Sequence, residues 1–413
     1  MKPKALLLSC STGGGHNSCA HAMIKHFEKN GWDTQFLDPY TLDSRKTANL
    51  VGGAYVHLIQ KYPKVFYGLY KAGEWYEKLE NIIPLPSPVL DVQKSTSRQL
   101  LDYLRKNPVD LIVCTHMYAG MMITLLKEEG LRLPPSILIT TDYACIPFET
   151  QADCDYTCIA SKDIEDEFLK WHLDPYEVLP LGIPVDPEFE KTVNRKEIRK
   201  KLELPVDKTL LLLGSGSMGF SSITKDFEDL EAFLEGHKDV NLLVMCGHSD
   251  DLYLQLLQEG HEQIKPIPFV DNVYDYVHAC DVYLTKPGGL SITEAAAAGT
   301  PLMLVSPIPG VESANAEYFE RKNMAFYARK PEEIIPFLEQ LLNPQIARAM
   351  VMAQKHTLPR HSGQAVVDFA SALVHLSPTK KARHSSPENS QTKPDLTDQS
   401  STEKVCHSDF LNP

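Results

Sequence analysis

The stretch ALLLSCSTGGGH at residues 5–16 decides the fold class, because an apolar run leads through three glycines straight into a helical pattern. Such a run is typical of a buried strand, and glycines let the backbone turn sharply and approach a ligand closely. The next segment carries apolar residues at the i, i+3, i+4, i+7 spacing of one helix face: Ala20, Met23, Ile24 and Phe27. Asn30-Gly31 then predicts the end of this helix. Strand, loop and helix in this order form the repeating unit of a parallel α/β sheet.

The same unit recurs along the chain and predicts one parallel sheet with crossover helices in each half. In the first half the expected strands are Ala5–Cys10, Gln35–Asp38, Leu111–Thr115, Ile137–Thr141 and Thr157–Ala160. In the second half they are Thr209–Leu213, Val240–Cys246, Val282–Thr285 and Pro301–Val305. We therefore expect two doubly wound, Rossmann-like domains in tandem. Their cleft would lie at the carboxyl ends of both sheets, where open α/β folds bind ligands.

Composition indicates the domain boundaries. LGIPVDP at residues 181–187 holds two prolines and a glycine and is typical of a connection between domains. We expect a first domain at residues 1–185, a linker at 186–205 and a second domain at 206–376. Residues 377–413 are rich in Ser, Thr, Lys, Asp, Asn and Pro and poor in large apolar groups, so they are predicted to be a disordered tail.

Charge and cysteine content narrow the function classes. The 413 residues carry a formal net charge of −13, which argues against broad electrostatic binding of nucleic acid. The nine cysteines are odd in number and scattered, as in a reduced cytosolic protein. A zinc site at Cys154 and Cys158 would lack a paired CxxC. No stretch approaches the roughly 20 apolar residues of a membrane span, so we expect a cytosolic chain, attached to a membrane at most by its surface.

His16 is the candidate general base. It follows the loop glycines Gly13, Gly14 and Gly15, where the free N–H groups of a helix start also point. An imidazole of ordinary pKa about 6.5 is suited to take a proton from a hydroxyl group, and a helix N-terminus favours its neutral form. The loop is neither a GxGxxG nor a Walker A motif. It is also compatible with a tight turn that binds nothing, and His16 with a capping or packing role.

The stretch TKPGGLSITE at residues 285–294 predicts the second binding element, because it joins an apolar strand to an alanine-rich helix. Gly288, Gly289 and the N–H groups near Leu290 and Ser291 would form a diphosphate pocket. Glu294, one turn into the helix, is placed to accept hydrogen bonds from ribose hydroxyls. Its plainer role is a favourable charge in the first helical turn.

Two further loops are expected at the same sheet edge. LGSGSMG at residues 213–219 is a strand followed by small residues, and it would close over the diphosphate through Gly214, Ser215, Gly216 and Ser217. PGVESANA at residues 309–316 follows the strand Pro301–Val305. There Glu312 and Asn315 are three residues apart and would reach sugar hydroxyls, or serve only as capping residues.

These motifs in this order resemble the monogalactosyldiacylglycerol synthases, the bacterial processive diacylglycerol glucosyltransferases and, more distantly, the MurG glycosyltransferases. The resemblance covers about residues 4–375 and rests on the GGGH loop, GIPV at 182–185, KPGG at 286–289 with Glu294, and the PGxExxNA segment. It implies a GT-B fold and an inverting, metal-independent transfer from a UDP-sugar. It also implies His16 as the base, Lys286 and the second-domain loops at the UDP, Glu294 on the ribose, Glu312 on the sugar, and Phe269-Val270 beside the uracil.

The chain departs from the family at two places. Val311 stands where the family often has Gln, which leaves the donor sugar open. After Thr141-Asp142-Tyr143 the family usually has a His and a Trp, whereas this chain reads ACIPF at residues 144–148, so the acceptor side differs. Asp153-Cys154-Asp155 matches the DxD pattern of metal-dependent transferases, but it lies in the first domain, away from the expected donor site.

A lipid acceptor, diacylglycerol by resemblance, requires a surface that meets the membrane. Residues 55–92 interleave aromatic side chains with lysines, a composition suited to an interface but equally to an ordinary packed helical hairpin. The sequence thus predicts a glycolipid-forming hexosyltransferase, peripheral on the inner face of the membrane. The alternatives are a MurG-type transferase that uses UDP-N-acetylglucosamine, a UDP-sugar 2-epimerase and, last, a non-catalytic nucleotide-sugar binding protein.

Overall fold

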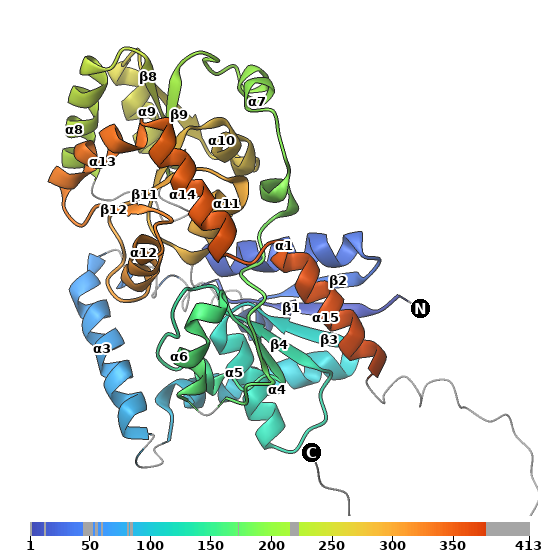
Figure 1. Ribbon diagram of the computed structural model, residues 1–413. Helices are drawn as coiled ribbons and strands as arrows, with labels where there is room; N and C mark the ends of the chain where they lie inside the picture. Colours follow the sequence, from blue (N-terminus) through green and yellow to red (C-terminus); the bar gives the residue numbers. More distant parts are fainter. Residues whose placement is uncertain are drawn as a thin grey trace, which may run out of the picture. The chain divides into compact units, whose positions relative to one another are not determined.

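The computed structural model describes residues 2–11, 14–43, 53, 57–58, 61–80, 82, 86–171, 173–214 and 223–376. The described residues up to Val374 belong to one compact unit. This unit holds two parallel sheets of six strands, each flanked by helices (Figure 1). The predicted α/β class with two doubly wound halves is therefore confirmed. The predicted tail, residues 377–413, lies outside the described residues.

The first sheet has the strand order β2-β1-β3-β4-β5-β6, and all its pairs are parallel. Its strands are β1 Lys4–Leu8, β2 Asp33–Leu37, β3 Leu111–Cys114, β4 Ser136–Ile139, β5 Tyr156–Cys158 and β6 Val178–Leu179. The second sheet has the order β12-β11-β10-β7-β8-β9 and is also parallel. Its strands are β7 Thr209–Gly214, β8 Val240–Gly247, β9 Ile264–Pro268, β10 Val282–Thr285, β11 Leu302–Leu304 and β12 Phe326–Tyr327.

Helices cross over between the strands, as parallel pairing requires. Those of the first half are α1 Gly14–Lys29, α3 Pro63–Glu80, α4 Pro88–Lys106, α5 Met117–Glu128 and α6 Glu165–Leu169. Those of the second half are α7 Arg195–Lys201, α8 Ile223–Gly236, α9 Asp250–Glu259, α10 Val273–Ala279, α11 Gly289–Ala298, α12 Val311–Arg321, α13 Ile334–Leu341, α14 Pro344–Thr357 and α15 Ser362–Leu376. Short 3-10 turns lie between them at η1 Pro39–Leu42, η2 Glu149–Gln151, η3 Lys162–Ile164, η4 Pro187–Glu190 and η6 Pro331–Glu333.

Both faces of the first sheet are buried, which explains why its strands read as unbroken apolar runs. Along β1, Ala5 and Leu7 belong to the core on the α1 side, and Leu6 and Leu8 to the core under α4 and α5. Successive strand residues point to opposite faces. A run such as residues 5–8 therefore fills both cores at once.

Three strands escaped the sequence analysis. β6 and β12 have two residues each and lie at sheet edges, and β9 carries Pro266 and Pro268 at the other edge of the second sheet. Proline is tolerated in edge strands because one side of the strand needs no ladder hydrogen bond. Short length and proline hide these strands from a pattern search.

The chain crosses between the two halves twice. Residues 186–205, predicted as a linker, hold η4 and α7, and Arg199 of α7 is buried against Asp281 at 2.7 Å and the carbonyl of Ala279 at 2.8 Å. The last helix, α15, returns to the first sheet (Figure 1). There Phe369 packs on Tyr156 with ring centroids 4.7 Å apart, and Gln364 exchanges hydrogen bonds with Asn30.

Candidate functional site

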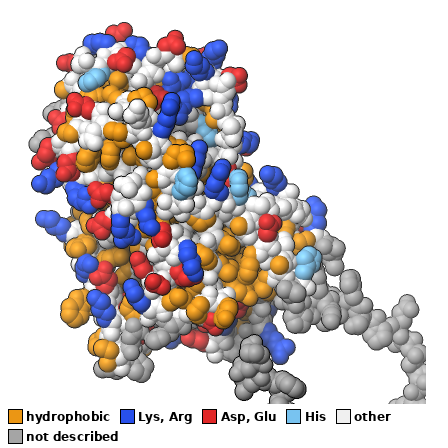
Figure 2. Space-filling view, viewed as in Figure 1, with side chains coloured by type: hydrophobic (Ala, Val, Ile, Leu, Met, Phe, Trp, Pro, Cys, Tyr) orange, Lys and Arg blue, Asp and Glu red, His pale blue; other side chains and the backbone are white. Residues whose placement is uncertain are grey.

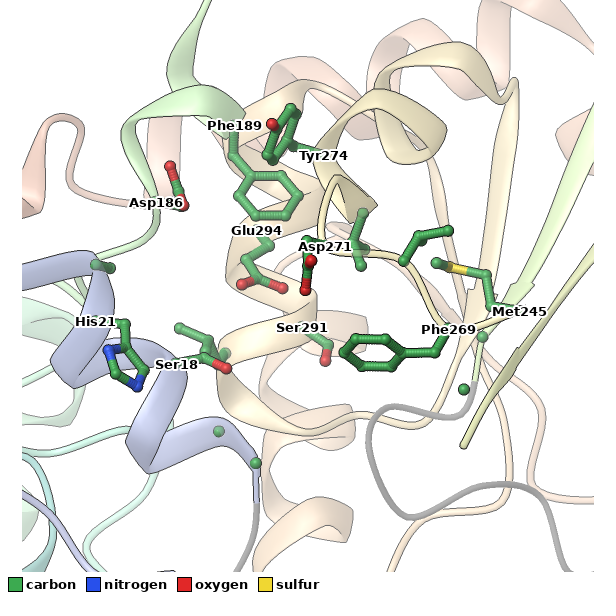
Figure 3. A pocket seen from close by; sticks show the side chains of 18 of the residues that line it. Ser18, His21, Asp186, Phe189, Met245, Phe269, Asp271, Tyr274, Ser291 and Glu294 are labelled. Carbon is green, nitrogen blue, oxygen red and sulfur yellow. The ribbon is translucent and has the colours of Figure 1, made fainter. Parts of the chain in front are cut away.

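A cavity of about 520 Å³ lies where the carboxyl ends of the strands in both halves meet. The first half contributes the start of α1, with Gly14, Gly15 and Ser18. The second half contributes the ends of β7, β8 and β9 and the first turns of α11 (Figure 3). The cavity therefore occupies the position predicted for a ligand in an open α/β fold.

Nine of the predicted donor residues fall into two groups around α11. Those that line the cavity are Gly214, Phe269, Val270, Leu290, Ser291 and Glu294. Lys286, Gly288 and Glu312 form a second group beside the start of α11. A Cβ placed on Gly288 would lie 3.7 Å from Oε1 of Glu312, and the charge of Glu312 acts on Lys286. Three predicted residues of the loop after β7, namely Ser215, Gly216 and Ser217, lie outside the described residues, as does Gly13 in the loop after β1.

Glu294 points into the cavity from the second turn of α11 (Figure 3). Burial, with a smaller contribution from the nearby carboxylate of Asp186, raises the pKa of its carboxyl to about 8. Asp186 is itself paired with Lys25 at 2.5 Å, across the junction between η4 and α1. A ligand that hydrogen-bonds to Glu294 would therefore meet a carboxyl whose position is fixed by the helix.

Phe269 supplies a flat apolar surface at the cavity. Its side chain is 53% exposed, and its ring stacks on His248 with centroids 4.1 Å apart and an interplanar angle of 15°. Figure 3 shows the Phe269 ring beside Ser291, on the opposite side of the cavity from α1. Such an arrangement suits a planar, aromatic ligand group. No sequence pattern singles out His248, which lies in a polar segment just before α9.

His16 lies in the first turn of α1 rather than in the loop before it. Its Nδ1 is 2.9 Å from the carbonyl oxygen of Thr115 and 3.1 Å from Oγ1 of Thr141, at the carboxyl ends of β3 and β4. A carbonyl oxygen only accepts hydrogen bonds, so Nδ1 carries the proton. The lone pair of the neutral ring is therefore on Nε2, which is the form of histidine that acts as a base.

The surroundings of His16 favour the neutral ring. Burial lowers the pKa of His16, while the carboxylate of Asp142 and the hydrogen bond to Thr115 oppose that fall. The neighbouring His116 makes an edge-on ring contact with centroids 4.4 Å apart. The pKa of His116 is lowered well below its ordinary value by burial and by the charge of His16. Sequence reasoning did not identify Thr115, Thr141 and His116 as neighbours of His16. The loops after β1, β3 and β4 are far apart in the sequence, and only the order of these strands in the sheet brings them together.

Gly289 and Asn315 join the two halves instead of lining the cavity. A Cβ placed on Gly289 would lie 1.9 Å from the backbone oxygen of Thr141, so only glycine allows this approach. Asn315 is 0% exposed and hydrogen-bonds Asp142, Tyr143 and the carbonyl of Pro287.

The acidic and cysteine motifs considered for metal binding have other roles. Asp155 of the DxD pattern accepts from the backbone N–H of Ser136 at 2.7 Å and pairs with Lys127 at 3.1 Å. Ser136 begins β4, so this motif lies at the opposite end of the sheet from the cavity. Cys154 and Cys158 belong to separate cores. Among the residues that the structure describes, no group of three or more His, Cys, Asp or Glu is arranged to hold a metal ion.

The aromatic segment combines a packed face and an exposed face on α3; Tyr55 and some neighbouring residues lie outside the described ranges. On the packed side, a Cβ on Gly73 would lie 2.9 Å from the ring of Phe148, and Glu77 accepts from the N–H of Phe148 at 2.5 Å. Trp75 is 74% exposed, and further large apolar side chains beside it are exposed: Tyr62, Val65, Tyr67, Leu69 and Leu79. Figure 2 shows hydrophobic and basic side chains next to one another along the edge where α3 lies. No helix in the described part of the chain is long and apolar enough to cross a membrane.

Comparison with known proteins identifies the class. The profile of monogalactosyldiacylglycerol (MGDG) synthase matches residues 16–185, and that of the glycosyltransferase family 28 C-terminal domain matches residues 209–367. The crystal structure of Acinetobacter baumannii MurG superposes with a TM-score of 0.58 at 18% identity, over 90% of this chain and 99% of the other. A UDP-N-acetylglucosamine 2-epimerase superposes with a TM-score of 0.54 at 11% identity, over 95% and 100%. Likeness at such identities concerns the fold alone, and it confirms the predicted GT-B architecture. The chain is a glycosyltransferase of this fold.

The family resemblance predicted from the motifs is also confirmed. The processive diacylglycerol beta-glucosyltransferase of Bacillus pumilus is 25% identical over 372 residues, which cover 88% of this chain and 94% of that protein. In this chain, a segment that matches the monogalactosyldiacylglycerol synthase model is thus followed by one that matches the C-terminal domain model of glycosyltransferase family 28.

Proposed function

We propose that the chain is an inverting glycosyltransferase that moves a hexose from a UDP-sugar to the hydroxyl of a membrane lipid of the diacylglycerol type. The observation that most supports this proposal is the arrangement around α11. On one side this helix places Glu294 in the cavity, and on the other its start meets Thr141, which contacts His16. A donor site and a base therefore lie on the two sides of a single helix start.

The donor nucleotide is assigned to the cavity. Stacking on Phe269 suits the uracil, and the carboxyl of Glu294 suits two ribose hydroxyls. The N–H groups at the start of α11, with the partial positive charge of the helix, suit the diphosphate. Lys286 and Glu312 beside Gly288 are placed for the diphosphate and the sugar, respectively. Asn315 is removed from the proposed sugar ligands, because its hydrogen bonds are made within the protein.

In the proposed reaction, Nε2 of His16 takes the proton of the acceptor hydroxyl while its oxygen attacks the anomeric carbon. The bond from that carbon to the UDP oxygen breaks, and UDP leaves with the electron pair. A single displacement inverts the anomeric configuration, so an α-linked donor yields a β-glycoside, the linkage in the name of the Bacillus relative. The fixed N–H donors of α11 would stabilise the charge on the leaving diphosphate without a metal ion.

The acceptor is assigned to the side of α3. The exposed Trp75 and Tyr67, together with the exposed lysines Lys64, Lys71 and Lys78, suit a lipid–water interface with anionic headgroups. Tyr70 of α3 reaches back to the site, because its ring lies 3.0 Å from where a Cβ on Gly310 would be, two residues before Glu312. We therefore propose a peripheral position on the cytoplasmic face of a membrane, where UDP-sugars are available.

The test is transfer from UDP-glucose, UDP-galactose or UDP-N-acetylglucosamine to vesicles containing diacylglycerol, with products identified by mass spectrometry. The expected product is a hexosyldiacylglycerol that forms only with vesicles present. His16→Asn is the matched variant, since the Asn amide retains a donor near the Thr115 carbonyl but has no equivalent of Nε2. Formation of a new sugar epimer without acceptor would instead identify an epimerase. UDP binding without turnover by any donor would identify a binding protein.

A further inference from the structure

Asn315 is held between the two halves of the chain with a fixed orientation. Its Oδ1 accepts from the backbone N–H of Tyr143 at 2.7 Å, while its Nδ2 donates to Oδ1 of Asp142 at 2.7 Å and to the carbonyl of Pro287 at 3.1 Å. A peptide N–H only donates and a carbonyl only accepts, so the amide has a single satisfactory orientation. The side chain is fully buried, which makes each of these bonds costly to lose.

Asp142 is connected to the base through its neighbour. Thr141 directly precedes Asp142 in the chain, and its hydroxyl oxygen lies 3.1 Å from Nδ1 of His16. The carboxylate of Asp142 is close enough for its charge to raise the pKa of His16. Asn315 on α12 therefore fixes an acidic group that acts on the base at the start of α1.

We propose that Asn315 is a positioning residue that makes the base dependent on closure of the two domains. It holds the carboxylate of Asp142 beside His16, and the negative charge of Asp142 stabilises the ring once Nε2 has taken the proton of the acceptor. The inference rests on the proposed function, in which His16 is the base. Its consequence is that the donor domain, when it closes on the nucleotide, completes the base in the acceptor domain.

The charges around Asp142 make this assistance necessary. Burial raises the pKa of Asp142, whereas Asn315, His16 and Thr141 lower it. Other ionisable groups that act on or with the same carboxyl come from η2, α12, α3 and the loop after β4: Glu149, Glu312, Tyr70 and Tyr143. Two of these are carboxyls, so the Asn315 amide is an important support of the ionised form.

The test compares Asn315→Leu with Tyr318→Phe. Leucine has nearly the same size but no donor for Asp142. Tyr318, one turn further along α12, is the control because its hydroxyl also bonds across the halves, to Ser161 at 2.9 Å and Asp163 at 3.1 Å. Losing a hydrogen bond to a charged group corresponds to about one to two pH units. In Asn315→Leu the pKa of Asp142 should rise by about that amount, and the weaker negative charge should lower the pKa of His16. The acid limb of the kcat profile should therefore move to lower pH, whereas in Tyr318→Phe it should stay.

A second measurement does not depend on catalysis. The carboxylate of Asp142 raises the pKa of His16, so in Asn315→Leu the His16 ring, followed by NMR with carbon-13-labelled histidine, should titrate at lower pH than in the wild type. The His16→Asn spectrum identifies its signal. If Asn315→Leu does not fold, Asn315→Asp retains the acceptor for Tyr143 but not the donors, and its acid limb should also move to lower pH.

Two results would overturn the inference. If Asn315→Leu and Tyr318→Phe had equal kinetic effects and neither moved the acid limb, Asn315 would only hold the two domains together. If Asn315→Leu raised only the KM for the donor and left the His16 titration unchanged, Asn315 would instead be a sugar ligand. If the wild type transfers no sugar while the NMR titration shifts as expected, the proposed function fails but the effect of Asn315 on His16 through Asp142 stands.

Discussion

Replacing Glu294 by glutamine should stabilise the protein at high pH while weakening its binding of UDP. The carboxyl has a pKa of about 8 in the folded chain against an ordinary value of 4.5. The unfolded chain therefore loses this proton first, and folding stability falls as the pH rises from about 4.5 to about 8. At 1.36 kcal/mol per pH unit the penalty is at most roughly 5 kcal/mol. Because the side chain is only half-buried, solvent reduces the expected effect to about 2 kcal/mol.

Urea denaturation at about pH 5 and about pH 9 measures this effect. Wild type and Glu294→Gln should have similar free energies of unfolding at the lower pH, and the variant should be more stable by about 2 kcal/mol at the higher one. Calorimetric titration with UDP near pH 8 should show affinity lowered about tenfold to a hundredfold, the cost of a charge-assisted hydrogen bond of about 1.5–3 kcal/mol. Stability and ligand binding would thus change in opposite directions at one residue.

Glu317→Gln is the control, since Glu317 is an exposed carboxyl on α12. It should leave both measurements within about 0.5 kcal/mol of the wild type. The reasoning is refuted if the stability difference between wild type and Glu294→Gln is the same at both pH values. Unchanged UDP affinity would refute the assignment of the cavity to the nucleotide.

Three further outcomes are expected. His16→Asn should lower kcat by about 10²–10⁴, the usual contribution of a general base, with UDP affinity by calorimetry unchanged; an equal loss of both would point to misfolding. Gly289→Ala should lower the free energy of unfolding by about 1–3 kcal/mol, because its methyl group would meet the Thr141 backbone at 1.9 Å, and near-wild-type melting would contradict that contact. Trp75→Ser should weaken vesicle binding by roughly tenfold, about 1.4 kcal/mol, in a sedimentation assay with little change in stability, and unaltered vesicle binding would remove α3 from the membrane surface.

The elements that the sequence predicted best are those whose signal is local. An apolar run followed by glycines and a helical stripe identifies β1 with α1, and β10 with α11, within fewer than thirty residues each. The two-residue strand β6 has no such signal, because its pairing with β5 is determined by the sheet rather than by its own side chains.

The role of Asn315 shows why part of the site lay beyond sequence reasoning. Its spacing from Glu312 places both near the start of one helix, and this much was predictable. Which of the two is used up in contacts between the halves depends on how the halves pack: Asn315 is fully buried against Asp142, while Glu312 stays half-buried beside Gly288. Contacts between domains are not encoded in the period of either helix, so the two roles became distinct only in the structure.

The chain is acidic and has carboxyls in its proposed donor site, yet it is proposed to bind an anionic diphosphate. Burial reduces the repulsion expected between these carboxyls and the ligand. It raises the pKa of Glu312 to about 7 and that of Glu294 to about 8, so near neutral pH both spend much of their time protonated and repel the ligand little. Lys286 and the positive end of α11 then set the local field, against a formal net charge of −13 for the whole chain. As pH rises above 8, ionisation of Glu294 adds a negative charge to the empty cavity, yet improves its hydrogen bonds to ribose. The pH dependence of UDP binding therefore reports which of these two effects is larger at Glu294, and a maximum near neutral pH would identify repulsion as the stronger.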